Sequence, residues 1–521
     1  MHQMHYKSPM TRLKTWLTGG MGVVVVVAAA KLLLHLATAS RYGYFGDELY
    51  FMACGEHLDW GYVDQPPLVA VVAWLVRHTL GTSLLAVRLP SALAGVALVL
   101  LTGLLAREMG GGRFAMGLSA LASALAFVYV VMHYLFTMNA FEPLFWTGCA
   151  CVLVRIVKTG DQRLWLWFGL VAGLGLQNKY SMAVYAFALV VGVLLCPERR
   201  AFARPWIWLG GAVALLIFLP NLIWNVQHGW PFFELMRNIR ASGRDVVLGP
   251  VEFVLRQVLD MNPANLPIWL AGLGWLLFSS RGRTFRPLGW AFLVALATFV
   301  LTKGKDYYLA PAFATLFAAG AVGIEHFTDG GWRRWLRPAL LALQALMVPF
   351  LPLSLPILPA DRLIAYQERL GFALPATEKA HARAALPHHF AWQFGWDEMV
   401  AAVAAAYHAM PPLEQARVAV IGNNYGDSGA VDLLGPRYGL PMKALGTHQS
   451  YWLWGPGDPS KDVFIVLGDR PERLARWCGD VQAVAELSHP WTAVWENGPV
   501  LVCRQPRVPL AEIWPKVKNW D

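Results

Sequence analysis

Residues 44–50 place two adjacent carboxylates, Asp47 and Glu48, just after an apolar segment that runs from about residue 16 to residue 38. Charged groups are costly near a membrane, so those that occur there usually serve a function. One such carboxylate can take the proton from a hydroxyl as that hydroxyl attacks a substrate. Alternatively, the two acids cap the next helix, because negative charge suits the positive end of a helix dipole.

A second acidic motif, Asp64-Gln65-Pro66-Pro67-Leu68, follows in the same polar link. Its prolines could simply start a helix that Asp64 caps. Alternatively, two or three oxygens from this link could hold a hard divalent cation. Asp64 is therefore a candidate metal ligand.

Two further polar motifs interrupt the apolar pattern. Asn139 and Glu142 lie at the start of a later apolar run, where Glu142 is either a surface acid or a second catalytic carboxylate opposite Asp47. His228 lies among tryptophans in residues 224–231. It is either a residue of the aromatic belt or a ligand for a metal or a phosphate.

Lysines and tyrosines gather at the ends of two other apolar runs. Lys179 is in Gln177-Asn178-Lys179-Tyr180, and Lys303, Lys305 and Tyr307 are in residues 302–308. The lysines could snorkel from the membrane to its surface. They could equally neutralise a phosphate there, since a compact ammonium group suits that task.

The composition defines the elements that must position these residues. The chain has 521 residues, of which 56% are hydrophobic and 15% charged, and this excludes disorder and favours a polytopic membrane protein. Its net charge of +10 would suggest nucleic acid binding in a soluble protein. Here the basic residues form short clusters between apolar runs, which is typical of topology signals.

About 20 apolar residues cross a bilayer as a helix. The sequence predicts eleven such helices, centred near residues 27, 97, 122, 149, 170, 189, 214, 271, 294, 315 and 345. The run from Pro66 to Leu80 is too short, and we expect an interfacial helix there.

Charge alternates regularly between the links that join these helices. If the N-terminus is cytoplasmic, every cytoplasmic link is short and basic. Those links hold Arg107 and Arg113; Arg155, Lys158 and Arg163; Arg199, Arg200 and Arg204; Arg281, Arg283 and Arg286; Arg333, Arg334 and Arg337. All the candidate site residues above then lie in the opposite links. The alternation supports eleven helices and an extracytoplasmic C-terminus.

The pattern changes near residue 358, which divides the chain into a transmembrane domain (1–357) and a C-terminal domain (358–521). Residues 416–422, 462–468 and 499–503 predict strands, whereas 398–408 and 472–477 predict helices. We expect a small extracytoplasmic α/β domain. Cys478 and Cys503 could pair there only if the domain faces an oxidising compartment.

Taken together, these motifs resemble GT-C glycosyltransferases that use polyprenyl-phosphate sugars, especially the protein O-mannosyltransferases and the lipid A aminoarabinose transferase. The similarity covers roughly residues 20–325. Its motifs are Asp47-Glu48, Asp64 to Leu68, Arg88-Leu89-Pro90, Asn139 to Glu142, Gly173 to Lys179, and Lys305 to Pro311.

The resemblance implies a multi-pass enzyme of the bacterial inner membrane that uses no nucleotide cofactor. Asp47 would be the catalytic carboxylate, with Glu48 and Glu142 as further candidates. Lys179 and Lys305 would contact the lipid phosphate, and the further candidate substrate-binding residues are Lys303, Tyr307, Arg88, Asn139 and His228. A divalent metal would involve Asp64 and His228. The aminoarabinose transferases carry Glu-Lys before the paired prolines, so Asp64-Gln65 lacks one phosphate-binding lysine and leaves the metal open.

We therefore expect transfer of a sugar from a polyprenyl-phosphate carrier to a hydroxyl acceptor, with inversion at the anomeric centre. The acceptor could be protein, lipid A, a glycolipid or an envelope polysaccharide. A lipid or sugar transporter is the alternative, although transporters usually place polar residues near the bilayer midplane and show inverted repeats. A sensor is disfavoured, because the acidic links lie far in sequence from the C-terminal domain.

Overall fold

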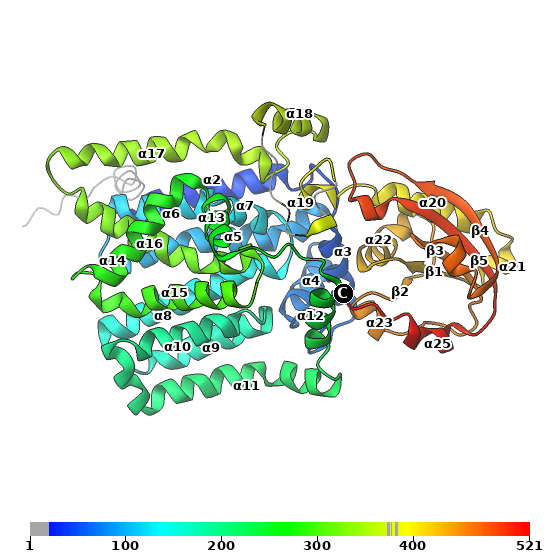
Figure 1. Ribbon diagram of the computed structural model, residues 1–521, viewed down its shortest axis with the longest axis horizontal. Coiled ribbons are helices and arrows are strands. Elements are labelled where there is room, and N and C mark those ends of the chain that lie inside the picture. Colours follow the sequence, from blue (N-terminus) through cyan, green and yellow to red (C-terminus); the bar gives the residue numbers. More distant parts are fainter. Residues whose placement is uncertain (1–19, 372–375, 377, 381–383) are drawn as a thin grey trace, which may run out of the picture.

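The computed structural model describes residues 20–371, 376, 378–380 and 384–521. Long helices of the N-terminal part run side by side along the longest axis, and the sheet of the C-terminal part lies beyond one of their ends (Figure 1). The beginning of the apolar segment predicted from about residue 16 falls outside the described residues.

Seven helical segments are long and apolar enough to cross a membrane. They are 20–38, 84–108, 138–159, 205–227, 283–301, 306–327 and 331–353. They contain α2 (Gly20–Thr38), α5 (Leu84–Glu108), α8 (Met138–Thr159), α11 (Pro205–Gln227), η3 (Arg283–Phe285) with α15 (Arg286–Leu301), η4 (Asp306–Ala312) with α16 (Phe313–Phe327), and η5 (Gly331–Trp335), α17 (Leu336–Leu346) and η6 (Val348–Leu353).

Two further pairs pass the same test but are sharply bent. Helices α6 (Arg113–Leu125) and α7 (Phe127–Tyr134) meet at 62°, and α10 (Met182–Leu194) and η1 (Pro197–Ala203) meet at 108°. The described residues therefore give seven to nine spans, and the predicted count of eleven is not confirmed. The difference comes from α9 (Leu164–Asn178) and α14 (Leu266–Phe278), which have 15 and 13 residues where a span needs at least 18.

Shorter helices gather at the end of the bundle that faces the C-terminal part. Helix α4 (Leu68–Thr79) has 12 residues, in agreement with the prediction that this run is too short to span. The others there are α3 (Gly46–Glu56), α12 (Pro231–Ser242), α18 (Ala360–Leu370) and α19 (His388–Ala391) (Figure 1). Two more short helices, α13 (Pro250–Asp260) and η2 (Pro263–Asn265), precede α14.

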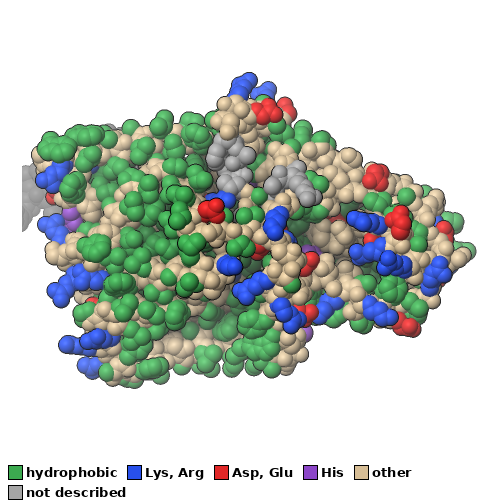
Figure 2. Space-filling view, viewed as in Figure 1, with side chains coloured by type: hydrophobic (Ala, Val, Ile, Leu, Met, Phe, Trp, Pro, Cys, Tyr) green, Lys and Arg blue, Asp and Glu red, His purple; other side chains and the backbone are tan. Residues whose placement is uncertain are grey.

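The basic links meet at the opposite end of the bundle. Figure 2 shows Lys and Arg side chains gathered there, away from the C-terminal part. Contacts join these links: Glu325 accepts hydrogen bonds from the backbone N–H groups of Gly112 and Ala115, and Arg337 lies over the Phe114 ring. The sequence alternation thus separates the two ends correctly, whereas the side of the membrane that each faces stays a prediction.

The C-terminal part contains a five-stranded mixed sheet in the order β2-β1-β3-β5-β4. Its strands are β1 (Val418–Gly422), β2 (Ala444–Gly446), β3 (Val463–Leu467), β4 (Cys478–Leu487) and β5 (Gly498–Pro506). Strands β2, β1 and β3 are parallel, and β5 is antiparallel to β3 and β4. The three predicted strands correspond to β1, β3 and β5. The sequence reading missed β2, which has three residues, and β4, whose residues are mostly exposed.

Helices cover this sheet and connect its strands. They are α20 (Trp396–His408), α21 (Pro412–Gln415), α22 (Tyr425–Leu434), η8 (Gly435–Tyr438), α23 (Ser450–Leu453), α24 (Pro471–Leu474), η9 (Val494–Glu496), α25 (Leu510–Ile513) and η10 (Trp514–Lys516). Helices α20 and α24 match the two that the sequence predicted.

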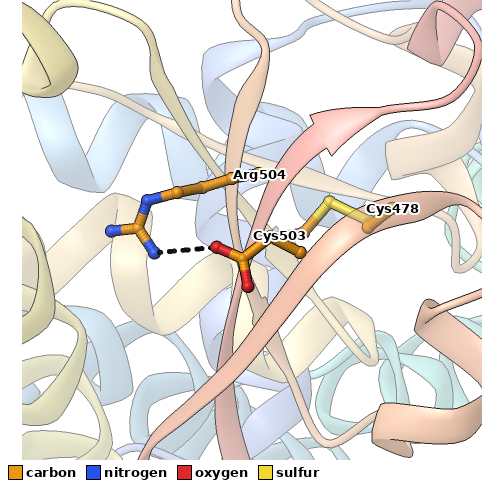
Figure 3. Close-up of a disulfide and its surroundings, with 4 residues drawn as sticks. Cys478, Cys503 and Arg504 are labelled. Atoms are coloured by element: carbon orange, nitrogen blue, oxygen red, sulfur yellow. Dashed lines mark ion pairs between the residues drawn. A yellow bond between two sulfur atoms is a disulfide. The ribbon is translucent and has the colours of Figure 1, made fainter.

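A disulfide joins the antiparallel edge of the sheet. Cys478 of β4 and Cys503 of β5 are bonded, with their Cα atoms 5.8 Å apart (Figure 3). The sequence had left this pairing open. Disulfides persist in oxidising compartments, so the bond agrees with an extracytoplasmic C-terminal part.

Candidate active site

A cavity of about 2050 Å³ lies where the helical bundle meets the C-terminal part. Its wall combines acids, cations, aromatic rings and an apolar surface. Helix α3, helix α12 and the link before η4 contribute from the bundle, and the loop after β1 contributes from the C-terminal part. Segments far apart in sequence thus meet around one space.

Asp47 lies in the first turn of α3 and lines this cavity. The Tyr425 hydroxyl donates a hydrogen bond to its Oδ1 at 2.8 Å. Burial raises the pKa of Asp47 to about 7, against the Tyr425 hydrogen bond, which lowers it. The negative charges of Asp64 and Glu378 raise this pKa further. Asp47 is therefore a carboxylate with an unusually high proton affinity.

Asp64 lines the same cavity. The Tyr50 hydroxyl lies 2.8 Å from its Oδ1, and burial raises the pKa of Asp64 to about 6. Asp47 and Asp64 thus each have a neutral hydroxyl as hydrogen-bond partner. A carboxylate held in this way keeps its ability to take a proton near neutral pH.

Glu48 has the opposite environment, although it is adjacent to Asp47. Its two oxygens accept hydrogen bonds from Arg88 at 2.8 Å and from the backbone N–H groups of Phe45 and Phe136 at 2.9 Å. Arg88 is itself buried, and its other N–H groups donate to the Ala39 and Gly43 carbonyls, the Tyr134 hydroxyl and the Gln393 side chain.

These contacts occupy the Glu48 carboxylate and the Arg88 guanidinium group. Glu48 and Arg88 lie outside the cavity lining formed by the described residues. Glu48 accepts a hydrogen bond from the Phe45 N–H and so completes the cap of α3. Helix capping was one of the two alternatives for the Asp47-Glu48 motif, and Glu48 is the acid that caps. Glu48 and Arg88 thus hold α3 in place through these contacts, and the catalytic and substrate-binding roles expected of them stay predictions.

Glu142 is buried and paired with Lys179, whose Nζ lies 2.8 Å from Oε2. The Ser181 hydroxyl also donates to Glu142, and Lys179 donates to Asn139 Oδ1 at 2.7 Å. Lys179 and Asn139 line the cavity, whereas Glu142 lies outside the lining formed by the described residues. Glu142 therefore holds Lys179 in place and does not face Asp47 as a second free carboxylate.

Lysines and tyrosines from two links converge on one wall. Lys179 Nζ lies over the rings of Tyr307 and Tyr308, at 5.5 and 4.7 Å from their centres. Lys305 pairs with Glu378 at 2.7 Å and with Asp245 at 3.3 Å. Burial alone would lower the pKa of Lys305, but these two acids raise it, so the group remains an ammonium. Lys303 is exposed at the cavity rim.

Four cavity arginines were missed by the sequence analysis: Arg237, Arg240, Arg244 and Arg256. Arg244 Nε lies 3.5 Å from Glu378 Oε2, in the cluster that holds Lys305. The sequence could have revealed these arginines, because they lie in a link where membrane topology requires no positive charge. Lys179 and Lys305 lie in links of the same kind.

The structure separates the two candidate metal ligands. His228 Nδ1 donates a hydrogen bond to the Trp224 carbonyl, and the His228 ring stacks on the Trp224 ring, outside the cavity lining of the described residues. The described residues contain no group of three or more His, Cys, Asp or Glu side chains placed to hold a metal. Asp47 and Asp64 alone offer too few ligands for such a site.

Three known proteins or families share features with this chain. The family model described as dolichyl-phosphate-mannose-protein mannosyltransferase matches residues 64–224. The lipid A galacturonosyltransferase RgtD of Rhizobium johnstonii is 25% identical over 331 residues, which are 61% of this chain and 68% of RgtD. ArnT from Cupriavidus metallidurans bound to undecaprenyl phosphate matches with a TM-score of 0.58 and 14% identity, over 92% of this chain and 98% of ArnT.

The apo form of the same ArnT gives a TM-score of 0.60 at 15% identity. The two ArnT matches show a shared fold along nearly the whole chain, including the C-terminal part. Together with the family model and RgtD, they confirm the resemblance to GT-C glycosyltransferases. They give no support to the transporter alternative.

Proposed function

We propose that this membrane glycosyltransferase of the GT-C fold moves a sugar from a polyprenyl phosphate to a hydroxyl of a lipid A-type acceptor. The observation that carries the proposal is the cavity itself. It is lined both by Asp47, whose pKa is raised to about 7, and by Lys305 and Arg244. A proton acceptor and a phosphate-binding wall are the two groups that such a transfer requires.

The reaction assigns each wall a task. Asp47 takes the proton of the acceptor hydroxyl as its oxygen attacks the anomeric carbon of the sugar. The bond from that carbon to the phosphate oxygen breaks, and the carrier leaves as a polyprenyl phosphate. Lys179, Lys305 and Arg244 stabilise the negative charge that grows on this leaving group. A single displacement of this kind inverts the anomeric centre.

An apolar stretch of the cavity wall suits the isoprenoid chain. Phe127, Val131 and Leu135 lie on or just after α7, and Met347 and Phe350 lie at the junction of α17 and η6. Both groups line the same cavity as the cations. A lipid tail against this surface would bring its phosphate to the basic wall, because burial of apolar groups favours that orientation.

We propose a hexuronate as the sugar. RgtD transfers galacturonic acid by name, and this chain carries cavity arginines beyond those needed for one phosphate. Arg237 and Arg240 are exposed on α12, and no carboxylate of the described residues forms an ion pair with either. Their guanidinium groups suit the carboxylate of a uronic sugar or a phosphate of the acceptor.

The test is a transfer assay with purified protein in liposomes. Undecaprenyl phosphate linked to a hexuronate, an aminopentose or a neutral hexose is supplied with lipid A, and products are identified by mass spectrometry. We expect lipid A with one added hexuronate, released undecaprenyl phosphate, and no product from the Asp47→Asn variant. Transfer of another sugar would overturn the hexuronate assignment alone. Movement of lipid across the bilayer without any transfer would overturn the proposed function.

A further inference from the structure

Helix α22 of the C-terminal part lies directly against α3, which carries Asp47. Their contact is at Gly429, where an added Cβ would lie 2.8 Å from the backbone carbon of Leu49. Real Cβ atoms are essentially never found so close, so glycine is what allows the two backbones to meet. The C-terminal part is therefore docked on the catalytic helix.

Tyr425 is the first residue of α22, and its place is fixed on several sides. Asn424 caps the helix by accepting hydrogen bonds from the N–H groups of Gly426 and Asp427 at 2.7 and 3.2 Å. The Tyr425 ring stacks on Tyr50 at 4.6 Å and on His448 at 4.8 Å between ring centres. A ring held in this way has little freedom to turn its hydroxyl away from Asp47.

The hydroxyl of Tyr425 remains a donor under all relevant conditions. Burial raises the pKa of Tyr425 well above its ordinary value, and the charge of Asp47 raises it further. Tyr425 therefore does not compete for the proton that Asp47 is to accept. Its hydrogen bond stabilises the ionised form of Asp47, the form that acts as a base.

A second contact joins the C-terminal part to Asp64, another carboxylate of the cavity wall. Ser450 Oγ lies 2.7 Å from the Tyr50 hydroxyl and accepts a hydrogen bond from the Val63 N–H at 3.1 Å. The Tyr50 hydroxyl in turn lies 2.8 Å from Asp64 Oδ1. Both carboxylates thus depend on side chains that the C-terminal part supplies or orients.

We infer that the C-terminal part is a working component of the active site, in which Tyr425 is a positioning residue that aims Asp47 and keeps it ionised. The inference rests on the proposed role of Asp47 as the base. It assigns a task to a domain that the sequence places more than 300 residues from the acidic link, since Tyr425 and Asp47 are 378 positions apart.

Several charged groups surround Asp47 and Tyr425. Asp64, Glu378 and Lys305 act on Asp47 directly, and Arg244 acts on Tyr425. Tyr425→Phe leaves all four charges in place and removes only one hydrogen bond to a carboxylate. The pKa of Asp47 should then rise by about one unit, which corresponds to a tenfold change in proton affinity.

The first measurement is the pH dependence of transfer in Tyr425→Phe. We expect kcat at pH 7 to fall by about fivefold, because the ionised fraction of Asp47 drops from about one half to about one tenth, with recovery towards the wild-type rate near pH 9 and an unchanged KM for the carrier-linked sugar. Tyr438→Phe is the matched control, because it removes a similar 2.9 Å hydrogen bond to Asp397 at a distant site. An unchanged pH profile, or an equal loss at every pH, would overturn the inference.

The second measurement needs no substrate. The difference in thermal stability between the wild type and Asp47→Asn, followed against pH, reports the pKa of Asp47 in the folded protein. The same difference in the Tyr425→Phe background should shift upwards by about one pH unit. If Asp47→Asn keeps full activity, the proposed base is wrong; if it is inactive while neither pH profile shifts in Tyr425→Phe, only the inference on Tyr425 fails.

Discussion

Two sets of acids in this molecule look alike in sequence and differ in their partners. Asp47 and Asp64 lie on the cavity wall and accept hydrogen bonds from the hydroxyls of Tyr425 and Tyr50. Glu48 and Glu142 lie outside the lining of described residues and pair with Arg88 and Lys179. The partner decides the role in each case.

The physical reason is the charge of the partner. A buried carboxylate next to a guanidinium or ammonium group has an opposite charge as partner, and removal of either partner leaves an uncompensated charge. A carboxylate held by a neutral hydroxyl has no such compensation, so burial raises its pKa towards neutrality. The first arrangement builds structure, and the second can exchange a proton.

The largest effect should come from Asp47→Asn, which removes the proton acceptor and keeps the shape. The transfer rate should fall by about 10²–10⁴-fold, the usual contribution of a general base. In the wild type, transfer should rise with pH through about 7, where Asp47 ionises. Near-normal turnover at equal protein level would contradict the distinction between the two sets.

Asp47→Asn should not lower the stability of the folded protein, so its loss of activity would not be a loss of folding. The pKa of Asp47 is about 7 in the folded protein and 3.8 ordinarily, so the wild type should lose stability as pH rises from about 4 to about 7. Asp47→Asn cannot ionise and should lack that loss. Thermal unfolding at pH 8 should therefore show the variant to be at least as stable as the wild type.

The sequence located the site better than it assigned the residues. Asp47, Asp64, Lys179 and Lys305 all line the cavity, because polar groups stand out in an apolar chain and collect at one end of its helices. The choice between Asp47 and Glu48 depended on Arg88, a partner 40 positions away. Nothing local could reveal that contact, nor the arrival of Tyr425 from the C-terminal part.

The fold shows the same limit. Hydropathy located each apolar run, and a helix lies at every predicted centre. The count failed at α9 and α14, because average apolarity does not report where a helix begins and ends. Strand β4 was missed for a related reason: its residues are mostly exposed, so it carries no apolar pattern.

The next substitution, Arg88→Met, should affect folding and not the transfer reaction. Arg88→Met leaves Glu48 buried without its charged partner, which typically costs 3–5 kcal/mol. We expect a large fall in thermal stability and in the yield of folded protein. The fraction that folds should keep a pH profile like that of the wild type, because Asp47 retains its own partners. A changed profile at unchanged stability would place Arg88 in the chemistry.

The smallest effects should come from the cations, which act on the leaving phosphate. Lys179→Met or Lys305→Met removes one charge-assisted hydrogen bond, worth about 1.5–3 kcal/mol, so use of the carrier-linked sugar should weaken by about 10–150-fold. Lys179→Met also leaves Glu142 buried without its charged partner, so it should lower thermal stability as Arg88→Met does. Lys303→Met is the matched control, because Lys303 lies at the rim and is exposed. Glu142→Gln should give a weaker version of Lys179→Met, since it loosens the lysine and leaves its charge. Equal kinetics in all four variants would show that these lysines serve the membrane surface and not the phosphate.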